Sequence, residues 1–241
     1  EIGVRLVGSE MCIRDRYRDD LRRFLKGDSH LAWDAAQRIT GSRDLYDPTY
    51  RGYNASVNFI TCHDGFTLYD MYSYNEKHNL ENGWNNTDGA NDNNSWNCGV
   101  EGDTNDYNIN KLRIKMIKNA FATLMCSQGP ALFLAGDEFC NTQFGNNNAY
   151  CQDNIISWLD WTRKEKHKDV FEFFKYMIQF RKNHPVISRK LPNAVCGMEK
   201  PPTICAKQVC SSKKVTDHHA IVPTISAEKV DMASLPPVSY T

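Results

Sequence analysis

The chain has 241 residues, enough for one large domain or two small ones. Lysine plus arginine and aspartate plus glutamate balance at 29 each, which argues against a dedicated nucleic-acid or anionic-membrane surface. No apolar run approaches the roughly 18 residues of a membrane span, and the N-terminus lacks the residue order of a secretory signal.

The nine cysteines are scattered and include no Cys-x-x-Cys pair. This usage predicts reduced thiols in a cytoplasmic protein. Cys205, Cys210, His218 and His219 could be forced into a zinc pattern, but their spacing fits no common site, so we expect no metal there.

The first elements in chain order are helical. Residues 1–16 show no helical or strand period and resemble a translated sequencing adapter, so we expect a non-native head. An amphipathic helix is then predicted over 17–26 from the i, i+4, i+7, i+8 spacing of Tyr17, Leu21, Phe24 and Leu25. Gly27-Asp28 ends it. A second helical segment is predicted over 31–39, and a polar loop over 47–54.

Residues 55–65 predict a short buried strand that ends in His-Asp-Gly. Val57, Phe59 and Ile60 supply β-branched and aromatic bulk, and His63 and Asp64 follow at the carboxyl end. In parallel β/α folds, ligands bind at that end of the strands. The alternative is that Asp64-Gly65 forms only a hairpin turn. A short helix is predicted within residues 66–74.

The segment 75–110 is rich in Asn, Asp and Gly, with Trp84, Trp96 and Tyr107 among them. It is long for an idle connection. One interpretation is disorder. The other is an ordered loop whose amides and flat rings contact a carbohydrate. A calcium loop is excluded because glycine and glutamate are out of place around Asp88 and Asp92.

The clearest helix is predicted over 111–128, where seven apolar residues share one face and Gly129-Pro130 follows. A buried strand is predicted over 131–135, closed by Gly136-Asp137-Glu138. The order strand, helix, strand predicts a parallel pair. A second amide-rich loop over 143–154 holds Tyr150, and an amphipathic helix is predicted over 170–181.

Five stretches together resemble the isoamylase and glycogen-debranching branch of the α-amylase superfamily, glycoside hydrolase family 13. The resemblance spans residues 17 to about 198, and its motifs are Ser56–Leu68, Tyr74–Asn79, Ser95–Gly102, Leu134–Phe139 and Gly145–Asn154. It implies an α/β fold, specifically a partial (β/α)8 barrel containing about strands seven and eight with their flanking helices.

The resemblance also implies a function and a set of site residues. Members hydrolyse α-1,6 branch points of glycogen and related α-glucans with retention of configuration, by a carboxylate nucleophile and a carboxylic acid. Asp64 would be a third carboxylate, which stabilises the transition state, and His63 would bind substrate hydroxyls. The expected substrate-binding residues are Asn75, Glu76, His78, Trp96, Asn148 and Tyr150. No metal and no cofactor is implied.

The resemblance is incomplete, because no stretch matches the family's nucleophile or acid. Asp137 and Glu138 correspond to residues with a structural or outer-site role, so we do not expect them to replace either group. We therefore expect a chain that is inactive by itself and exposes unpaired strand edges.

The tail departs from the family. Residues 186–200 are expected to begin a truncated β-domain, and 201–241 to form a disordered or topoisomerase-like tail, because 213–224 resemble a motif of type IA DNA topoisomerases. The domain prediction is thus a head over 1–16, a barrel portion over 17–185, and these two segments.

Three functions follow from these observations. The first is part of a glucan-debranching hydrolase that does not act alone. The second is a non-catalytic glucan-binding module built on the amide-rich loops. The third, a nucleic-acid binder, rests only on the tail, and the balanced net charge opposes it.

Overall fold

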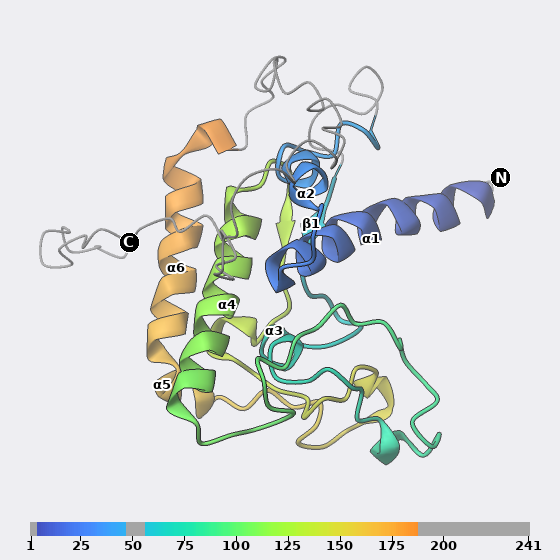
Figure 1. Ribbon diagram of the computed structural model, residues 1–241, viewed down its shortest axis with the longest axis vertical. Coiled ribbons are helices and arrows are strands. Elements are labelled where there is room, and N and C mark those ends of the chain that lie inside the picture. The colour runs from blue at the N-terminus through green and yellow to red at the C-terminus, as the bar shows by residue number, and fades with distance from the viewer. Residues whose placement is uncertain (1–3, 47–55, 188–241) are drawn as a thin grey trace, which may run out of the picture. The chain divides into compact units, whose positions relative to one another are not determined.

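The computed structural model describes residues 4–46 and 56–187, with side chains described from residue 15 onward. Helices dominate this part, and one parallel pair of strands lies among them (Figure 1). The α-helices are α1 Val4–Lys26, α2 Ala32–Ile39, α3 Leu68–Met71, α4 Tyr107–Cys126, α5 Arg163–Lys166 and α6 Lys168–Asn183. The strands are β1 Asn58–Phe59 and β2 Ala131–Leu132. Short 3-10 turns cover η1 Leu80–Asn82, η2 Asp137–Phe139, η3 Ala149–Cys151 and η4 Pro185–Ile187.

Helix α1 begins earlier than its apolar period indicates. The sequence predicts a helix over 17–26, whereas the helix runs from Val4, so the expectation of no regular structure over 1–16 is wrong from residue 4 onward. Tyr17 and Leu21 are buried and fix the C-terminal half. Once a helix is nucleated, residues such as Glu, Met and Arg extend it at little cost. The predicted helix over 31–39 is confirmed as α2.

Helix α1 is joined to the end of β1 and to the first amide-rich loop by one buried arginine. Arg22 donates from Nε to the Ile60 carbonyl at 2.8 Å and from Nη1 to the Asn93 carbonyl at 2.9 Å. Tyr17 donates to Ser127 Oγ at 2.7 Å, which ties α1 to the end of α4. These bonds fix the strand whose carboxyl end leads to His63.

The two strands are parallel, as the strand-helix-strand order predicts. Asn58 is opposite Ala131, and Phe59 is opposite Leu132. Each strand is only two residues long, so the longer strands expected within 55–65 and over 131–135 are not formed in full. Leu132 is 43% exposed, which corrects the expectation of a buried second strand. A parallel strand is buried only when neighbours and helices cover it, and within the described residues each strand has one strand partner.

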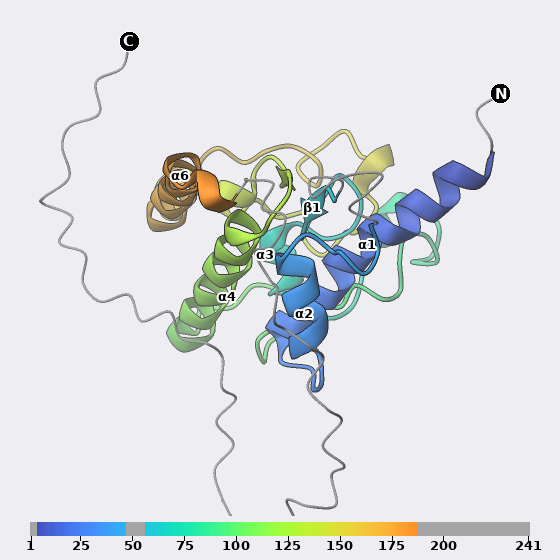
Figure 2. The ribbon, with the colours of Figure 1, turned by 90° about the horizontal axis from the view of Figure 1, so that it is seen from above.

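Helices α4 and α6 form the main apolar contact on one side of the sheet, and α1 with α2 lie on the other (Figures 1 and 2). The rings of Phe121 and Phe174 stack with centroids 3.5 Å apart, and Phe133 meets Phe121 edge-on at 5.4 Å. The helices predicted over 111–128 and 170–181 are thereby confirmed as α4 and α6. The predicted short helix over 66–74 is α3.

The described part therefore contains one parallel strand-helix-strand unit, with helices before and after it, and its regular structure is mainly helical. Among these residues, no helix is both long and apolar enough to cross a membrane. The predictions for the polar loop over 47–54, the possible zinc residues and the tail fall on residues outside the described ranges. The first residues of the predicted β-domain, 186 and 187, lie in η4, and the domain boundaries stay predictions.

Candidate active site

His63 and Asp64 lie just beyond β1, where the sequence places them. Their side chains are 86% and 76% exposed, and His63 Nε2 is 3.1 Å from Asp64 Oδ2. The next element is α3, and β1 pairs in parallel with β2, so the hairpin alternative is wrong. Gly65 adopts a φ of +88° that favours glycine. The pair thus presents an imidazole and a carboxylate side by side to solvent.

A buried carboxylate fixes the backbone on both sides of this pair. Asp137 accepts hydrogen bonds from the Thr61 hydroxyl, from Leu68 N at 2.8 Å and from Leu134 N at 3.3 Å. Burial raises the pKa of Asp137 to about 7, although these three bonds each lower it. Because its oxygens are occupied and it is 1% exposed, Asp137 is placed to hold structure and not to attack a substrate.

Glu138, the other carboxylate after β2, caps its own loop. Its Oε2 accepts from Gly136 N at 2.8 Å. Gly136 has a φ of +100°, and an added Cβ there would lie 2.7 Å from Asn141 Cβ. The Gly136-Asp137-Glu138 stretch is therefore a tight turn built for backbone geometry.

A second buried carboxylate, which sequence reasoning missed, ties α3 to the second amide-rich loop. Asp70 accepts from the Thr142 hydroxyl and from Gln143 N at 2.7 Å. Burial raises the pKa of Asp70 to about 6, against the lowering effect of these bonds. In the sequence, Asp70 is a single acid among the apolar residues of a short helix. That pattern does not show whether the acid is buried or exposed.

The two amide-rich loops are ordered and bind each other. Asn79 Nδ2 donates to Asn147 Oδ1 at 2.8 Å, and Asn147 N donates to Asn79 Oδ1 at 3.0 Å. Asn147 Nδ2 also donates to Asn93 Oδ1 at 2.8 Å. Of the two interpretations of 75–110, the ordered loop is the one observed. The Asn147 carbonyl accepts from Gly65 N at 3.0 Å, so the network reaches the His63–Asp64 pair.

Asn148, predicted to bind substrate, belongs to this network. Its Nδ2 donates to Asp88 Oδ2 at 2.9 Å, and Asn82 Nδ2 donates to the same oxygen at 2.8 Å. The bond from Asn82 is the main reason why the pKa of Asp88 is lowered. Within the residues that the structure describes, no cluster of three or more His, Cys, Asp or Glu side chains could hold a metal ion.

Three other predicted residues are brought together by a carboxylate that the sequence analysis did not single out. Glu101 accepts from Asn75 N at 2.8 Å, from Glu76 N at 2.9 Å, and lies 3.4 Å from His78 Nε2. Burial raises the pKa of Glu101, but these bonds outweigh it and the net shift is downward. Glu101 lies within the Ser95–Gly102 motif, so the sequence analysis included this residue but assigned it no role.

The two predicted aromatic residues differ in availability. Trp96 packs against the hydrophobic core, and its backbone N donates to the Met71 carbonyl at 3.0 Å. Tyr150 is 76% exposed on η3. Gln152 Nε2 donates to the Glu81 carbonyl at 2.9 Å, so the loop that carries Tyr150 adjoins η1. Exposed Trp84 follows η1 and is a further ring on this surface.

Comparison with known proteins identifies the kind of protein to which this arrangement belongs. No protein-family model matches the chain. The "Glycogen operon protein GlgX homolog" of Mycobacterium tuberculosis is 50% identical over 175 residues, which are 73% of this chain and 24% of that protein. "Isoamylase 3, chloroplastic" of Oryza sativa subsp. japonica is 50% identical over 175 residues, which are 72% of this chain and 22% of that protein.

A solved structure agrees. The pullulanase from Bacillus acidopullulyticus matches with a TM-score of 0.53 and 26% identity over 73% of this chain and 19% of that chain. Over these residues the chain is homologous to glycoside hydrolases of the α-amylase family. Within that family it is a homologue of the isoamylase and GlgX debranching enzymes, and it spans about a quarter of the length of the curated relatives it matches. The comparisons give no support to the topoisomerase resemblance of the tail.

Proposed function

We propose that this chain carries part of the active site of a hydrolase that cleaves α-1,6 branch points in glycogen or related α-glucans with retention. One observation carries the proposal: a chain 50% identical to an isoamylase over 175 residues presents His63 and Asp64, open and paired, at the carboxyl end of a parallel strand. Strands β1 and β2 would be strands seven and eight of a (β/α)8 barrel.

Asp64 acts in this proposal as a fixed negative charge. Glycoside cleavage passes through a transition state that resembles an oxocarbenium ion. A carboxylate held near the sugar therefore stabilises the transition state more than the ground state. The backbone around Asp64 is held by Asp137 and by the Asn147 carbonyl. His63, in contact with Asp64, hydrogen-bonds the hydroxyls of the sugar being cleaved.

In this proposal neither Asp137 nor Glu138 is the nucleophile or the acid. Asp137 has its oxygens occupied by three donors, and Glu138 caps Gly136. Without two carboxylates about 5–5.5 Å apart across the bond, the retaining reaction does not proceed. The chain alone is thus proposed to bind α-glucan without cleaving it, which also covers the alternative of a non-catalytic glucan-binding module.

The surroundings of the site fit a neutral, hydroxyl-rich ligand. Glu76, His78 and Tyr150 are exposed beside the ordered loops. Solved pullulanases have been crystallised with maltotetraose and with maltohexaose, and we extend that class of ligand to this chain as a proposal. All five cysteines with described side chains are free, which fits the reducing cytoplasm proposed for it.

Co-sedimentation with glycogen tests the proposal. The purified chain is expected to sediment with glycogen, and the double substitution of His63→Ala with Asp64→Ala is expected to reduce the bound fraction several-fold. Asp153→Asn is the matched control, because Asp153 is exposed and its contact to Trp158 Nε1 can be kept by an amide oxygen. Equal binding by the double variant and the control would remove the pair from the glucan site.

A further inference from the structure

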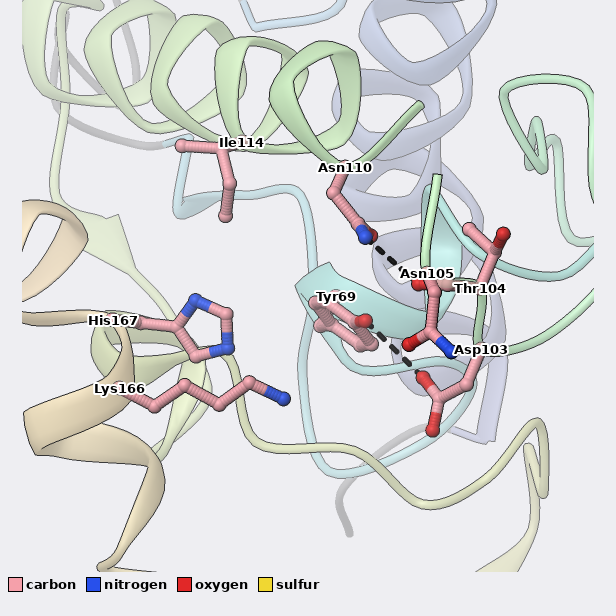
Figure 3. A pocket seen from close by; sticks show the side chains of 8 residues that line it. All are labelled: Tyr69, Asp103, Thr104, Asn105, Asn110, Ile114, Lys166 and His167. Carbon is pink, nitrogen blue, oxygen red and sulfur yellow. Dashed lines mark hydrogen bonds between the residues drawn. The ribbon is translucent and has the colours of Figure 1, made fainter. Parts of the chain in front are cut away.

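A pocket of 490 Å³ lies beside α3. It is lined by Tyr69 of α3, the loop 103–105, Asn110 and Ile114 of α4, and Lys166 with His167 at the junction of α5 and α6 (Figure 3). Its volume falls within the roughly 300–1,000 Å³ of small-molecule sites. Neither His63 nor Asp64 lines it.

The lining favours a ligand that is polar and uncharged. One carboxylate, Asp103, and one ammonium group, Lys166, contribute opposite charges, so the pocket has no excess of either sign. A single carboxylate is a poor cation site. The remaining polar groups are hydroxyls, amides and an imidazole, which pair well with the hydroxyls of a sugar.

His167 supplies an unused hydrogen-bonding atom in the wall. Figure 3 shows its imidazole directed into the pocket towards Tyr69, and its Nε2 is buried without a hydrogen-bond partner among the described residues. Burial lowers the pKa of His167 to about 4, so the ring is neutral at pH 7. A neutral imidazole pairs with a hydroxyl as donor or as acceptor. The Lys166 side chain beside it is exposed, so it can move aside for a ligand.

An exposed aromatic ring lies on the same face of α4 as the pocket. Tyr107, Asn110 and Ile114 follow the i, i+3, i+7 spacing of one helix face, and the last two line the pocket. Tyr107 is 73% exposed. Tyr107 does not line the pocket itself, but it lies one helical turn before Asn110, and a flat ring in that position is suited to cover the apolar face of a sugar that extends from the pocket.

From this arrangement we propose a second maltooligosaccharide site between the N-terminal ends of α4 and α6, with His167 and Asp103 inside it and Tyr107 at its rim. The ligand class rests on the proposed function, whereas the location rests on the pocket itself. The site holds a glucan chain and does no chemistry. It gives the chain two points of attachment to one branched polymer, which raises avidity without a new reaction.

The second site can be tested by NMR. The full 241-residue chain is titrated with maltotetraose while the signals of its histidine rings are followed. Signals of His63 and His167 are expected to shift, and those of His184, which stacks on Phe180, are expected to stay. The signals are assigned by their loss in His63→Gln and His167→Gln. An equal concentration of sorbitol serves as the control for a non-sugar polyol and should move none of them.

Matched tyrosine variants separate the two sites. Tyr107→Ala should raise the Kd reported by His167 roughly fivefold or more, as expected for loss of an aromatic contact, and leave the His63 response unchanged. Tyr176 is an exposed tyrosine on a different helix, α6, so Tyr176→Ala should change neither the His167 response nor the His63 response. Asp64→Ala should leave the His167 response intact.

Each outcome decides between the proposals. A His63 shift without a His167 shift overturns the second site and leaves the proposed function standing. A His167 shift without a His63 shift supports the second site and removes His63 from glucan binding. No shift of either ring at millimolar maltotetraose overturns both.

Discussion

At the scale of single residues, buried carboxylates hold the carboxyl end of β1 in place. Asp137 joins Thr61 to Leu68, the residues on either side of the His63–Asp64 pair, and Asp70 joins α3 to the loop at 142–145. Each carboxylate is desolvated, so each is protonated more readily in the folded chain than in the unfolded chain.

The first prediction concerns pH. The pKa of Asp137 is about 7 in the folded state and 3.8 as its ordinary value, so its stabilising effect is complete below about pH 4 and is lost as pH rises through 7. Asp137→Asn should make the free energy of unfolding less dependent on pH, by up to about 1.4 kcal/mol per pH unit between pH 5 and 7. Urea denaturation at each pH measures the difference between variant and parent.

The comparison with the parent is necessary because the protonation of other groups also makes the free energy of unfolding depend on pH in this range. Asp70 contributes a slope of the same sign, and His167, whose pKa is lowered to about 4, contributes one of opposite sign. A parallel pair of curves for Asp137→Asn and the parent would show that Asp137 is ionised at all these pH values.

The second prediction concerns Glu101. Glu101→Gln replaces one acceptor oxygen by a donor that faces the Asn75 and Glu76 amides. We expect hydrogen exchange of those two amides to accelerate, since each lost bond to a charged group costs about 1 kcal/mol at this partly exposed site. The melting temperature should change little, because Glu101 is exposed and lies outside the hydrophobic core. Unchanged exchange at both amides would contradict the assigned contacts.

Residue identity locates candidate side chains better than it predicts their contacts. His63 and Asp64 were found from the sequence because a short apolar strand ends in two polar side chains. Glu101 and Asp70 were missed, because a carboxylate that accepts backbone hydrogen bonds has the same sequence signal as one in solvent. The contacts of Asn79 with Asn147 span 68 residues, and no local pattern indicates such a pair.

At the scale of elements, the two amide-rich loops behave as one unit. Gly89 lies against this contact: a Cβ at this position would be 2.2 Å from Asn147 Oδ1 and 2.8 Å from Asn79 Nδ2. The chain can bring the loops together here only because glycine has no side chain. The loop unit then fixes the Gly65 amide through the Asn147 carbonyl.

The third prediction uses two glycines with similar backbone angles. Gly89→Ala and Gly83→Ala both place a side chain at positive φ, +71° and +79°, but nothing lies within 4 Å of a Cβ at Gly83. Both should carry the cost of backbone strain, about 1 kcal/mol. Gly89→Ala alone should separate the loops, accelerate exchange of the Gly65 amide and weaken glycogen binding. Equal effects from the two variants would show that the loop contact does not support the site.

The bounds of long elements were predicted more closely than those of short ones. Helices α4 and α6 carry enough apolar residues to define a period, and their bounds agree with the prediction within a few residues. Helix α5 has four residues and no period of its own. The strands were predicted longer than observed because apolar composition indicates burial, whereas strand length depends on the neighbours that each strand finds.

At the scale of the whole molecule, the described residues contain one part of the proposed site together with the packing and hydrogen bonds that hold it in place. The core between α4 and α6 supports β2, and α1 supports β1 through Arg22. The carboxylates near the strand ends are Asp64, which is open, and Asp137 and Glu138, which accept hydrogen bonds from the protein. This division fits a chain that contributes transition-state stabilisation while attack and proton donation come from elsewhere.

The fourth prediction follows from the core. Phe121→Ala should lower the free energy of unfolding by about 3–5 kcal/mol, because its ring stacks on Phe174 and is 1% exposed. Tyr176→Ala, at a half-exposed ring on α6, should change it by less than about 0.5 kcal/mol. Chemical denaturation measures both. A small effect of Phe121→Ala would mean that α4 and α6 do not pack as described.

The most direct test of the central claim is a segment exchange. Residues of this chain that match rice isoamylase 3 would replace their counterparts in that protein, and release of reducing ends from glycogen would be measured. We predict that the hybrid debranches glycogen and that Asp64→Asn in the hybrid lowers the rate by at least about a hundredfold. A folded hybrid that binds glycogen and cleaves it equally well with Asp64→Asn would contradict the role assigned to Asp64.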